Sequence, residues 1–304
     1  MKVTEECLSK VKKDCFKFIK SQETATEKFG NKDGMLKSFL IPMCFWIAKK
    51  ANNKKPYFVG LAGGQGTGKT TTSSIIKIIL EKYFKLKVFK ISIDDFYKTR
   101  KERLNLSKKV HPMLMTRGVP GTHDTKMLLN TIKALKKTRF KKILIPKFNK
   151  GFDDRTSKNK WLRVNKKPNI VIFEGWCVGA EPQKKNDLLA PVNALEKHED
   201  KKKIWRNKVN NELKKDYKKV FKLLDKIIFL KVPSFNYVLK WRLLQEKKLR
   251  ITSKGNKTMS DNQIKNFIMF YERLTKHMLN TLTNKADSVI KIDTKHRLRS
   301  IKFN

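Results

Sequence analysis

The feature that most constrains this chain is a glycine-rich stretch, GLAGGQGTGKTTTSS, at 60–74. The segment before it, 57–62, is short, apolar and prone to β structure. In the segment after it, apolar residues recur at helical spacing: Ile75, Ile76, Ile79, Leu80 and Tyr83. The sequence therefore predicts a strand, a loop and a helix in this order.

The loop carries a phosphate-binding motif, because Gly63, Gly68, Lys69 and Thr70 fit the spacing G-x-x-x-x-G-K-[ST]. Glycines let backbone N–H groups turn toward phosphate oxygens, and the dipole of the following helix favours anions. Lys69 can reach the β- and γ-phosphates, while the Thr70 hydroxyl can hold a bridging magnesium ion. Four fixed positions with the correct flanks disfavour a chance glycine-rich turn. We expect nine residues to bind a nucleoside triphosphate: Gly63, Gly64, Gln65, Gly66, Thr67, Gly68, Lys69, Thr70 and Thr71.

Strand segments alternate with helical segments along the rest of the chain. The further strands are expected within KVFKISI, KKILIPKF, NIVIFEGW, KIIFLKV and SVIKID, and an irregular stretch is expected up to about residue 122. This alternation favours a mostly parallel sheet with helices on both faces, the three-layer α/β/α arrangement of P-loop NTPases. We expect a single domain over 1–304, with extra N-terminal helices at 1–52 and a helical lid at approximately 237–262.

The charge balance raises the question of a polyanionic partner. Lys and Arg number 72 against 27 Asp and Glu, which gives a formal net charge of +45. The lysines are spread through almost every segment, so a solvated surface coat is favoured over a nucleic-acid groove. We therefore expect a small-molecule substrate, no specific nucleic acid, and a monomer or homodimer.

Cysteines and apolar runs indicate the compartment. Cys7, Cys15, Cys44 and Cys177 are scattered without a C-x-x-C pair, which suggests neither a disulfide framework nor a zinc site. The run FLIPMCFWIA at 39–48 is too short to span a bilayer and reads as a buried helix or helix pair. We expect a cytoplasmic protein without a membrane segment.

Acidic residues follow two of the predicted strands. Asp94 and Asp95 come just after one strand, and Glu174 ends another. Ligands of parallel sheets gather at the carboxyl ends of strands, so all three should lie beside the phosphate loop. Phosphoryl transfer to a hydroxyl needs a carboxylate for the hydroxyl proton and an acid that fixes magnesium. The structural alternative is a turn cap at Asp95 and a salt bridge at Glu174.

Six motifs give the chain a specific resemblance. They are GGQGTGKTT, SIDDFY (92–97), RGVPGTHD (117–124), PKFNK (146–150), FEGW (173–176) and WRLLQE (241–246). In order and approximate spacing they resemble the D-glycerate 3-kinases of the plant and cyanobacterial type, relatives of uridine kinase, phosphoribulokinase and bacterial pantothenate kinase. The likeness covers about 38–293. It implies an ATP-dependent transferase that acts on an alcohol group.

The resemblance also implies roles for the acidic residues. Asp94 would act as general base, with Asp95 assisting it or contacting the magnesium shell. Glu174 would be the second magnesium-linked acid, so that Thr70, Asp94 and Glu174 form the metal site. Asp124 would bind a substrate hydroxyl, and the adjacent His123 could do the same, or could instead be a helix cap or a packed imidazole.

Glycerate carries a carboxylate, so its pocket needs cations. The candidates are Arg117, Lys147 and Arg155, whose alternative is ordinary surface charge. Arg242 resembles a lid arginine that neutralises the phosphoryl group in flight. Its structural alternative is an i, i+4 pair with Glu246.

The sequence thus predicts an ATP- and Mg²⁺-dependent kinase of a small metabolite, with D-glycerate as the leading acceptor. The catalytic residues would be Lys69, Asp94, Glu174 and Arg242. A uridine-type acceptor is the alternative, and it would need an aromatic platform drawn from Tyr97, Phe148 and Trp176. An ATP-dependent nucleic-acid-binding protein, suggested by charge alone, and a nucleotide-binding protein without catalysis are more remote readings.

Overall fold

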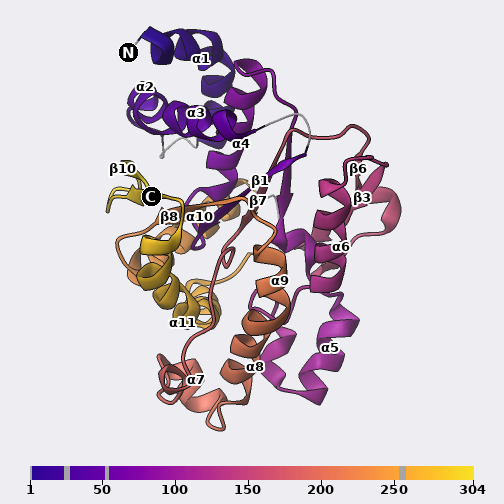
Figure 1. Ribbon diagram of the computed structural model, residues 1–304. Coiled ribbons are helices and arrows are strands. Elements are labelled where there is room, and N and C mark those ends of the chain that lie inside the picture. The colour runs from indigo at the N-terminus through magenta and orange to yellow at the C-terminus, as the bar shows by residue number, and fades with distance from the viewer. Residues whose placement is uncertain (1, 24–27, 52–54, 253–257) are drawn as a thin grey trace.

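The computed structural model describes residues 2–23, 28–51, 55–252 and 258–304. At its centre lies a six-stranded sheet of order β10-β9-β8-β1-β7-β2 (Figure 1). The strands are β1 (Tyr57–Gly63), β2 (Val88–Ser92), β7 (Ile170–Gly175), β8 (Lys226–Lys231), β9 (Ser288–Ile292) and β10 (Leu298–Phe303). All neighbours pair in parallel except β10, which runs antiparallel to β9. The prediction of a mostly parallel sheet is confirmed.

Both faces of the sheet are covered, because every residue of β7 and every residue of β1 after Tyr57 is buried. Helix α4 (Lys69–Lys82) contacts β1, β2 and β7. Helix α11 (Asp261–Lys285) contacts β8 and also packs against α10 (Phe235–Thr252). Helix α6 (Thr125–Lys136) packs against α9 (Lys218–Phe221).

The N-terminal segment is helical, as predicted. It contains α1 (Lys2–Gln22), α2 (Lys32–Met35), a π-helical turn η1 (Leu36–Leu40) and α3 (Ile41–Lys50). Pro42 lies in the first turn of α3, where a missing backbone N–H costs little. Helices α1 and α3 pack on α4, and these elements lie together at one end of the molecule (Figure 1). Their buried residues belong to the same hydrophobic core as the central sheet.

The structure departs from the expected arrangement in three places, although the strand expected within KKILIPKF is present. Residues 100–109 form helix α5 (Arg100–Lys109) instead of an irregular stretch, because Thr99 and Glu102 build a reciprocal capping box. The strand in KKILIPKF is β3 (Ile143–Ile145), which pairs with β6 (Leu162–Val164) outside the central sheet. The expected last strand, β9, is followed by the further edge strand β10.

The remaining elements connect the sheet to the helices. They are the 3-10 turns η2 (Ile93–Phe96), η3 (Pro112–Met115), η4 (Lys158–Lys160) and η5 (Asn186–Leu188), the short strands β4 (Phe148–Asn149) and β5 (Asp154–Arg155), helices α7 (Ala194–Glu199) and α8 (Ile204–Glu212), and the π-helical turn η6 (Leu213–Tyr217). Over the described ranges, no helix combines the length and apolar character that a membrane span requires.

Candidate active site

The glycine-rich loop joins β1 to α4 in the predicted manner. Gly66 and Gly68 take left-handed φ angles of 75° and 81°, which glycine adopts without strain. Helix α4 begins at Lys69, directly after Gly68. The Lys69 ammonium donates a 2.7 Å hydrogen bond to the carbonyl oxygen of Gly64. Burial lowers the pKa of Lys69 to about 8, against the attraction of Glu174 and Asp94. The loop therefore holds a partly desolvated cation at the amino end of a helix.

The loop also packs tightly on helix α10, which the sequence did not indicate. A Cβ at Gly64 would lie 2.9 Å from Val238, and one at Gly66 would lie 2.9 Å from the Cβ of Trp241. Both α10 side chains are buried. Glycine at these two positions thus allows the close approach of α10 to the loop.

Glu174 reaches the loop from the neighbouring strand. It pairs in register with Leu61 of β1 near the carboxyl end of β7 and is only 8% exposed. Its Oε1 accepts a 3.0 Å hydrogen bond from the Thr70 hydroxyl, and its Oε2 accepts a 2.7 Å bond from the Ser73 hydroxyl. Ser73 was missed at the sequence level. Its spacing of three residues after Thr70 was the available signal, since it places both hydroxyls on one face of α4.

The donor set around Thr70 fits magnesium. Mg²⁺ in kinases is held by one or two carboxylates together with substrate phosphates and water, so a cage of many acidic residues is not needed. A threonine hydroxyl that donates to Glu174 keeps its lone pairs available for a cation. No group of three or more His, Cys, Asp or Glu suited to a metal occurs in the described part of the chain. Thr70, Glu174 and Asp94 would accordingly share the ion with phosphate oxygens.

Asp94 lies just after the end of β2, inside the turn η2. Its Oδ1 accepts a 2.9 Å hydrogen bond from the Tyr97 hydroxyl, and its Oδ2 accepts a 2.7 Å bond from the Lys150 ammonium. Burial would raise the pKa of Asp94, but Lys150 in particular overrides it and lowers that pKa to about 2. Asp94 is therefore ionised at neutral pH. Lys150 was not among the predicted site residues.

Asp95 points toward the β4–β5 hairpin. Its carboxylate accepts a 2.9 Å bond from Lys147 and a 3.4 Å bond from the backbone N–H of Phe148. Burial raises the pKa of Asp95, and Lys147 offsets part of this effect. These contacts tie the hairpin to η2.

His123 and Asp124 both have structural partners. The His123 ring stacks on Tyr97 with centroids 4.5 Å apart, and its Nδ1 lies 2.5 Å from the Tyr217 hydroxyl. Burial lowers the pKa of His123 to about 3, so the ring is neutral. Asp124 caps α6 by accepting from the N–H of Met127, and its second oxygen lies 3.4 Å from Arg155. His123 thereby supports the ring of Tyr97, which in turn contacts Asp94.

The three predicted cations all face acidic residues. Arg117 forms an ion pair with Asp153. Lys147 pairs with Asp95, and Arg155 donates a 2.9 Å bond to the carbonyl oxygen of Tyr97 in addition to its contact with Asp124. The structure brings these cations to one rim, around η2 and the β4–β5 hairpin.

Arg242 lies on α10, at the turn of the helix that touches Gly66. It forms a 2.6 Å ion pair with Glu246, the i, i+4 arrangement recognised as the structural alternative. Glu246 also accepts a 2.7 Å bond from the N–H of Met259, beyond the end of α10. Part of the predicted lid, 253–257, lies outside the described residues.

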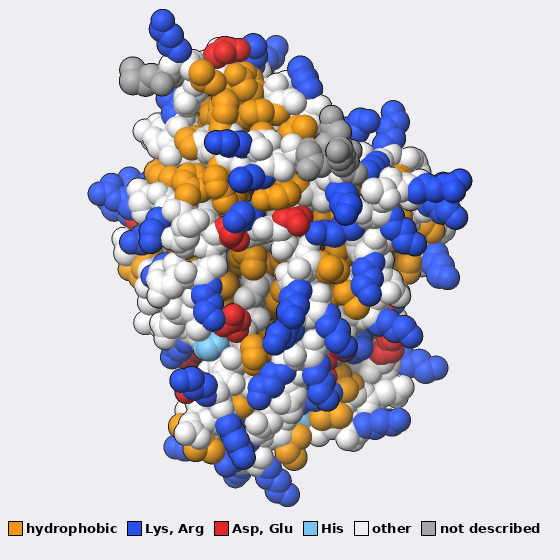
Figure 2. Space-filling model, viewed as in Figure 1, with side chains coloured by type: hydrophobic (Ala, Val, Ile, Leu, Met, Phe, Trp, Pro, Cys, Tyr) orange, Lys and Arg blue, Asp and Glu red, His pale blue; other side chains and the backbone are white. Residues whose placement is uncertain are grey.

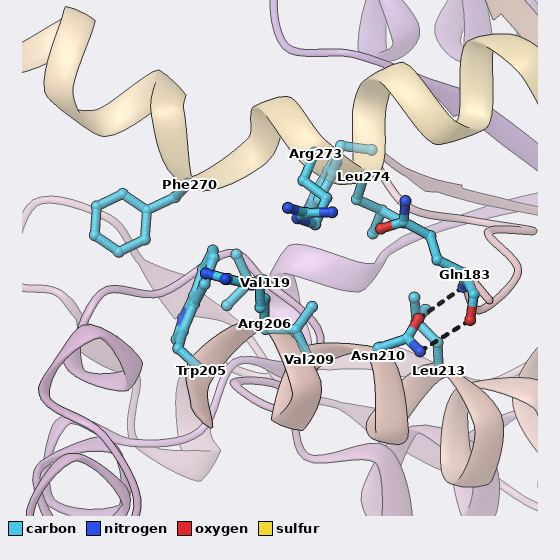
Figure 3. Close-up of a pocket in the computed structure, with 11 residues that line it drawn as sticks. Val119, Gln183, Trp205, Arg206, Val209, Asn210, Leu213, Phe270, Arg273 and Leu274 are labelled. Atoms are coloured by element: carbon cyan, nitrogen blue, oxygen red, sulfur yellow. Dashed lines mark hydrogen bonds between the residues drawn. The ribbon is translucent and has the colours of Figure 1, made fainter. Parts of the chain in front are cut away.

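A small cavity lies between α8 and α11 (Figure 3). Its volume of about 20 Å³ has room for roughly one water molecule. Trp205 of α8 and Phe270 and Arg273 of α11 line it. Arg273 donates hydrogen bonds to Glu196 and to two carbonyl oxygens. Trp176, one of the candidate aromatic residues, also lines this cavity, but Lys69, Asp94 and Glu174 do not.

Lysine and arginine are distributed over the whole face shown in Figure 2 and do not gather in one patch. Only a few acidic side chains interrupt them on that face. On this face the basic side chains are dispersed and do not form a groove of like charge.

Comparison with known proteins places this geometry in context. No family model matches the chain. The chain is 34% identical over 240 residues to the uncharacterized kinase mug58 of Schizosaccharomyces pombe, which covers 76% of this chain and 84% of that protein. It is 30% identical over 268 residues to the chloroplastic D-glycerate 3-kinase of Arabidopsis thaliana. That alignment covers 82% of this chain and 56% of the relative, so the chain spans just over half of the plant protein.

A solved structure shares the fold. The D-glycerate 3-kinase of Cryptococcus neoformans var. grubii superposes with a TM-score of 0.69 at 23% identity, over 88% of this chain and 97% of that chain. The predicted resemblance and the three-layer α/β/α fold are confirmed. The chain belongs to the P-loop kinases and is an ATP-dependent phosphotransferase that acts on an alcohol group of a small metabolite.

Proposed function

We propose that the chain transfers the γ-phosphoryl group of ATP to the 3-hydroxyl of D-glycerate, with Mg²⁺ as the metal. One observation carries the proposal: the carboxylates of Asp94 and Glu174 both interact electrostatically with Lys69 of the phosphate loop, beside a rim of cations suited to an acidic acceptor. The name of the plant relative, a D-glycerate 3-kinase, supports the choice of acceptor.

The loop would bind the triphosphate. Its backbone N–H groups and the amino end of α4 offer donors to phosphate oxygens. The Lys69 ammonium would leave the carbonyl oxygen of Gly64 for the β- and γ-phosphates, a stronger, charge-assisted contact. Thr70 and Glu174, with Asp94 nearby, would hold Mg²⁺, which when bound neutralises charge on the phosphates.

Asp94 would orient the acceptor hydroxyl and take its proton. The hydroxyl oxygen attacks the γ-phosphorus, the bond from that phosphorus to the β–γ bridging oxygen breaks, and ADP departs with the electron pair. Because the pKa of Asp94 is held at about 2, the carboxylate is ionised throughout the neutral range. Tyr97 fixes its orientation through the 2.9 Å bond to Oδ1.

The surroundings of Asp94 favour an acidic acceptor over a nucleoside. Arg117, Lys147 and Arg155 would supply the cations of the rim, each beside an acidic partner, Asp153, Asp95 and Asp124 respectively. Asp95 and Asp124 would contact the acceptor's hydroxyls, while His123 supports Tyr97. A uridine-type acceptor would need a free aromatic face. One face of Tyr97 is already stacked on His123, and Trp176 is buried against Tyr271.

We also propose that residues 237–262 act as a lid and that the whole chain is one kinase domain. The contact of Gly66 with Trp241 couples α10 to the phosphate loop, so nucleotide binding and α10 position would respond to each other. Arg242 would then exchange Glu246 for the transferring phosphoryl group. The cytosol is the proposed compartment, since all four cysteines are buried free thiols.

A coupled ADP-release assay tests the proposal. Wild type, Asp94→Asn and the surface control Asp216→Asn would be compared with D-glycerate, uridine, pantothenate and ribulose 5-phosphate. We expect turnover with D-glycerate, a loss of about 10²- to 10⁴-fold in kcat for Asp94→Asn, and no change for the control. Phosphorus NMR of the product identifies the hydroxyl. Equal turnover of D-glycerate by wild type and Asp94→Asn would show that the assigned base is wrong.

A further inference from the structure

The group that directly blocks Asp94 is Lys150, a residue to which no role has been assigned above. Its ammonium lies 2.7 Å from Oδ2, while Tyr97 engages Oδ1. Both oxygens of the proposed base are therefore in use. An acceptor hydroxyl that approaches Asp94 must share or displace one of these two donors.

Lys150 is the donor that can move. Its side chain is 63% exposed, whereas Tyr97 is 4% exposed and held by ring contacts with His123 and Phe148. A lysine ammonium sits on a flexible four-carbon stem and can rotate to a new partner without disturbing the packing. The acceptor hydroxyl would accordingly displace Lys150 and leave Tyr97 in place.

The backbone beneath Lys150 is anchored, so its ammonium stays within reach of the acceptor. Asp153, in the same turn, has a left-handed φ of 54° and forms ion pairs with two arginines. The buried Arg103 donates to its carbonyl oxygen at 2.6 Å and lies 3.0 Å from its carboxylate. Arg117 pairs with the same carboxylate and donates to the carbonyl oxygen of Lys150 at 3.4 Å.

The other cations of the rim are less free to change partner. Lys147 pairs with the largely buried Asp95, and Arg155 is 11% exposed and bonded to the carbonyl oxygen of Tyr97. Arg117 helps to fix the turn itself. Lys150 therefore combines an anchored backbone, a mobile ammonium and direct contact with the base.

We propose that Lys150 recognises the acceptor's carboxylate, and that it reaches this carboxylate by leaving Asp94 as the acceptor's hydroxyl arrives. The inference rests on the proposed function, because it requires an acceptor that carries both groups. In D-glycerate two carbon–carbon bonds of about 1.5 Å each separate the carbon of the 3-hydroxyl from the carboxylate carbon. A hydroxyl at Oδ2 thus brings the carboxylate close to the displaced ammonium. Lys150 would act as a specificity residue that also screens the base until the acceptor binds.

The test compares Lys150→Met, Lys150→Arg and the control Lys158→Met, an exposed lysine of the neighbouring turn η4. Steady-state kinetics would be measured with D-glycerate and with glycerol, which lacks the carboxylate. We expect Lys150→Met to raise KM for D-glycerate about 10- to 100-fold, the loss of one hydrogen bond to a charged group. Turnover of glycerol should not fall, and Lys150→Arg should recover most of the affinity. Thermal melting verifies that each variant is folded.

A second readout separates this inference from the proposed function. D-glycerate binding to wild type and Lys150→Met would be measured by calorimetry without nucleotide. Failure of wild type to phosphorylate D-glycerate would overturn the proposed function, whatever the variants do. An unchanged D-glycerate Kd in Lys150→Met, or no measurable binding to wild type, would overturn the role of Lys150. So would an equal fall in kcat for D-glycerate and glycerol with KM unchanged, since Lys150 would then act on Asp94 alone.

Discussion

The Glu174 carboxylate accepts a hydrogen bond from the Thr70 hydroxyl at 3.0 Å, although 104 residues separate the two along the chain. Parallel pairing of β1 with β7 creates this contact, because it places the ends of both strands at one edge of the sheet. The contact unites the phosphate loop with the acid proposed to hold magnesium.

Removing the charge of Glu174 should weaken the metal site without unfolding the protein. In Glu174→Gln the amide oxygen can still accept from Thr70 or Ser73, but it no longer neutralises a cation. We expect the Mg²⁺ concentration for half-maximal activity to rise about 10- to 100-fold. Titration of Mg²⁺ at saturating ATP measures this. Glu181→Gln, at an exposed ion pair with Lys285, is the matched control. An unchanged Mg²⁺ requirement would remove Glu174 from the metal site.

The pKa of Lys69 predicts an alkaline limb in nucleotide use. Burial lowers this pKa to about 8 in the free protein, so the ammonium is lost as pH rises through about 8. Because kcat/KM reports the free enzyme, kcat/KM for ATP should fall above pH 8, by up to about tenfold per pH unit. Lys69→Met should have a low kcat/KM for ATP, and this value should not fall further above pH 8. An alkaline limb that persists in Lys69→Met would assign it to another group.

His123 should remain neutral in the physiological range. Its folded-state pKa of about 3 lies below the ordinary value of 6.5, because the ring is buried against Tyr97 and Tyr217; the charge of Asp94 opposes this shift and that of Lys98 adds to it. NMR should show no titration of this imidazole between pH 5 and 8.

The low pKa of His123 also makes the stability of the fold depend on pH. Below pH 6.5 His123 is protonated in the unfolded chain but stays neutral in the folded protein. The free energy of unfolding should therefore fall with decreasing pH, by at most about 1.4 kcal/mol per pH unit. This contribution is fully present above pH 6.5 and is lost as pH falls toward 3. Urea unfolding should show a shallower acid dependence in His123→Gln than in wild type. His198→Gln, which removes an exposed imidazole, is the control; equal slopes in both variants would contradict the assignment.

Two loop glycines allow backbone strain to be separated from helix packing. Gly66 and Gly68 both have left-handed φ, but only at Gly66 would an added Cβ meet Trp241, whereas at Gly68 nothing lies within 4 Å. Gly68→Ala should cost about 1–2 kcal/mol from the backbone alone. Gly66→Ala should cost more, because α10 must also shift. Urea denaturation compares the two variants. An equal decrease in the free energy of unfolding would mean that α10 shifts at no cost, and would weaken the proposed coupling between α10 and the loop.

The sequence predicted those elements whose pattern lies within a few neighbouring residues, and not those that depend on contacts between distant segments. The loop, the helix that follows it and the apolar faces of α1 and α6 are encoded by local spacing, so they could be read directly. Helix α5 could also have been found, since the T-x-x-E pattern of Thr99 and Glu102 is a local capping signal. The pairing of β3 with β6 could not, because it depends on a long-range partner that periodicity does not name.

The residues of the site divide in the same way. The sequence by itself determined that a phosphate loop is present, that Asp94 follows a strand and that Glu174 lies at the end of another, because motif spacing and strand ends are local properties. Only the tertiary structure decided which partner each side chain meets: Ser73 for Glu174, Lys150 for Asp94, and Trp241 for Gly66. These contacts join segments that are distant in sequence. They arise from the order of strands in the sheet and the close packing of helices, and no local pattern of residues specifies either.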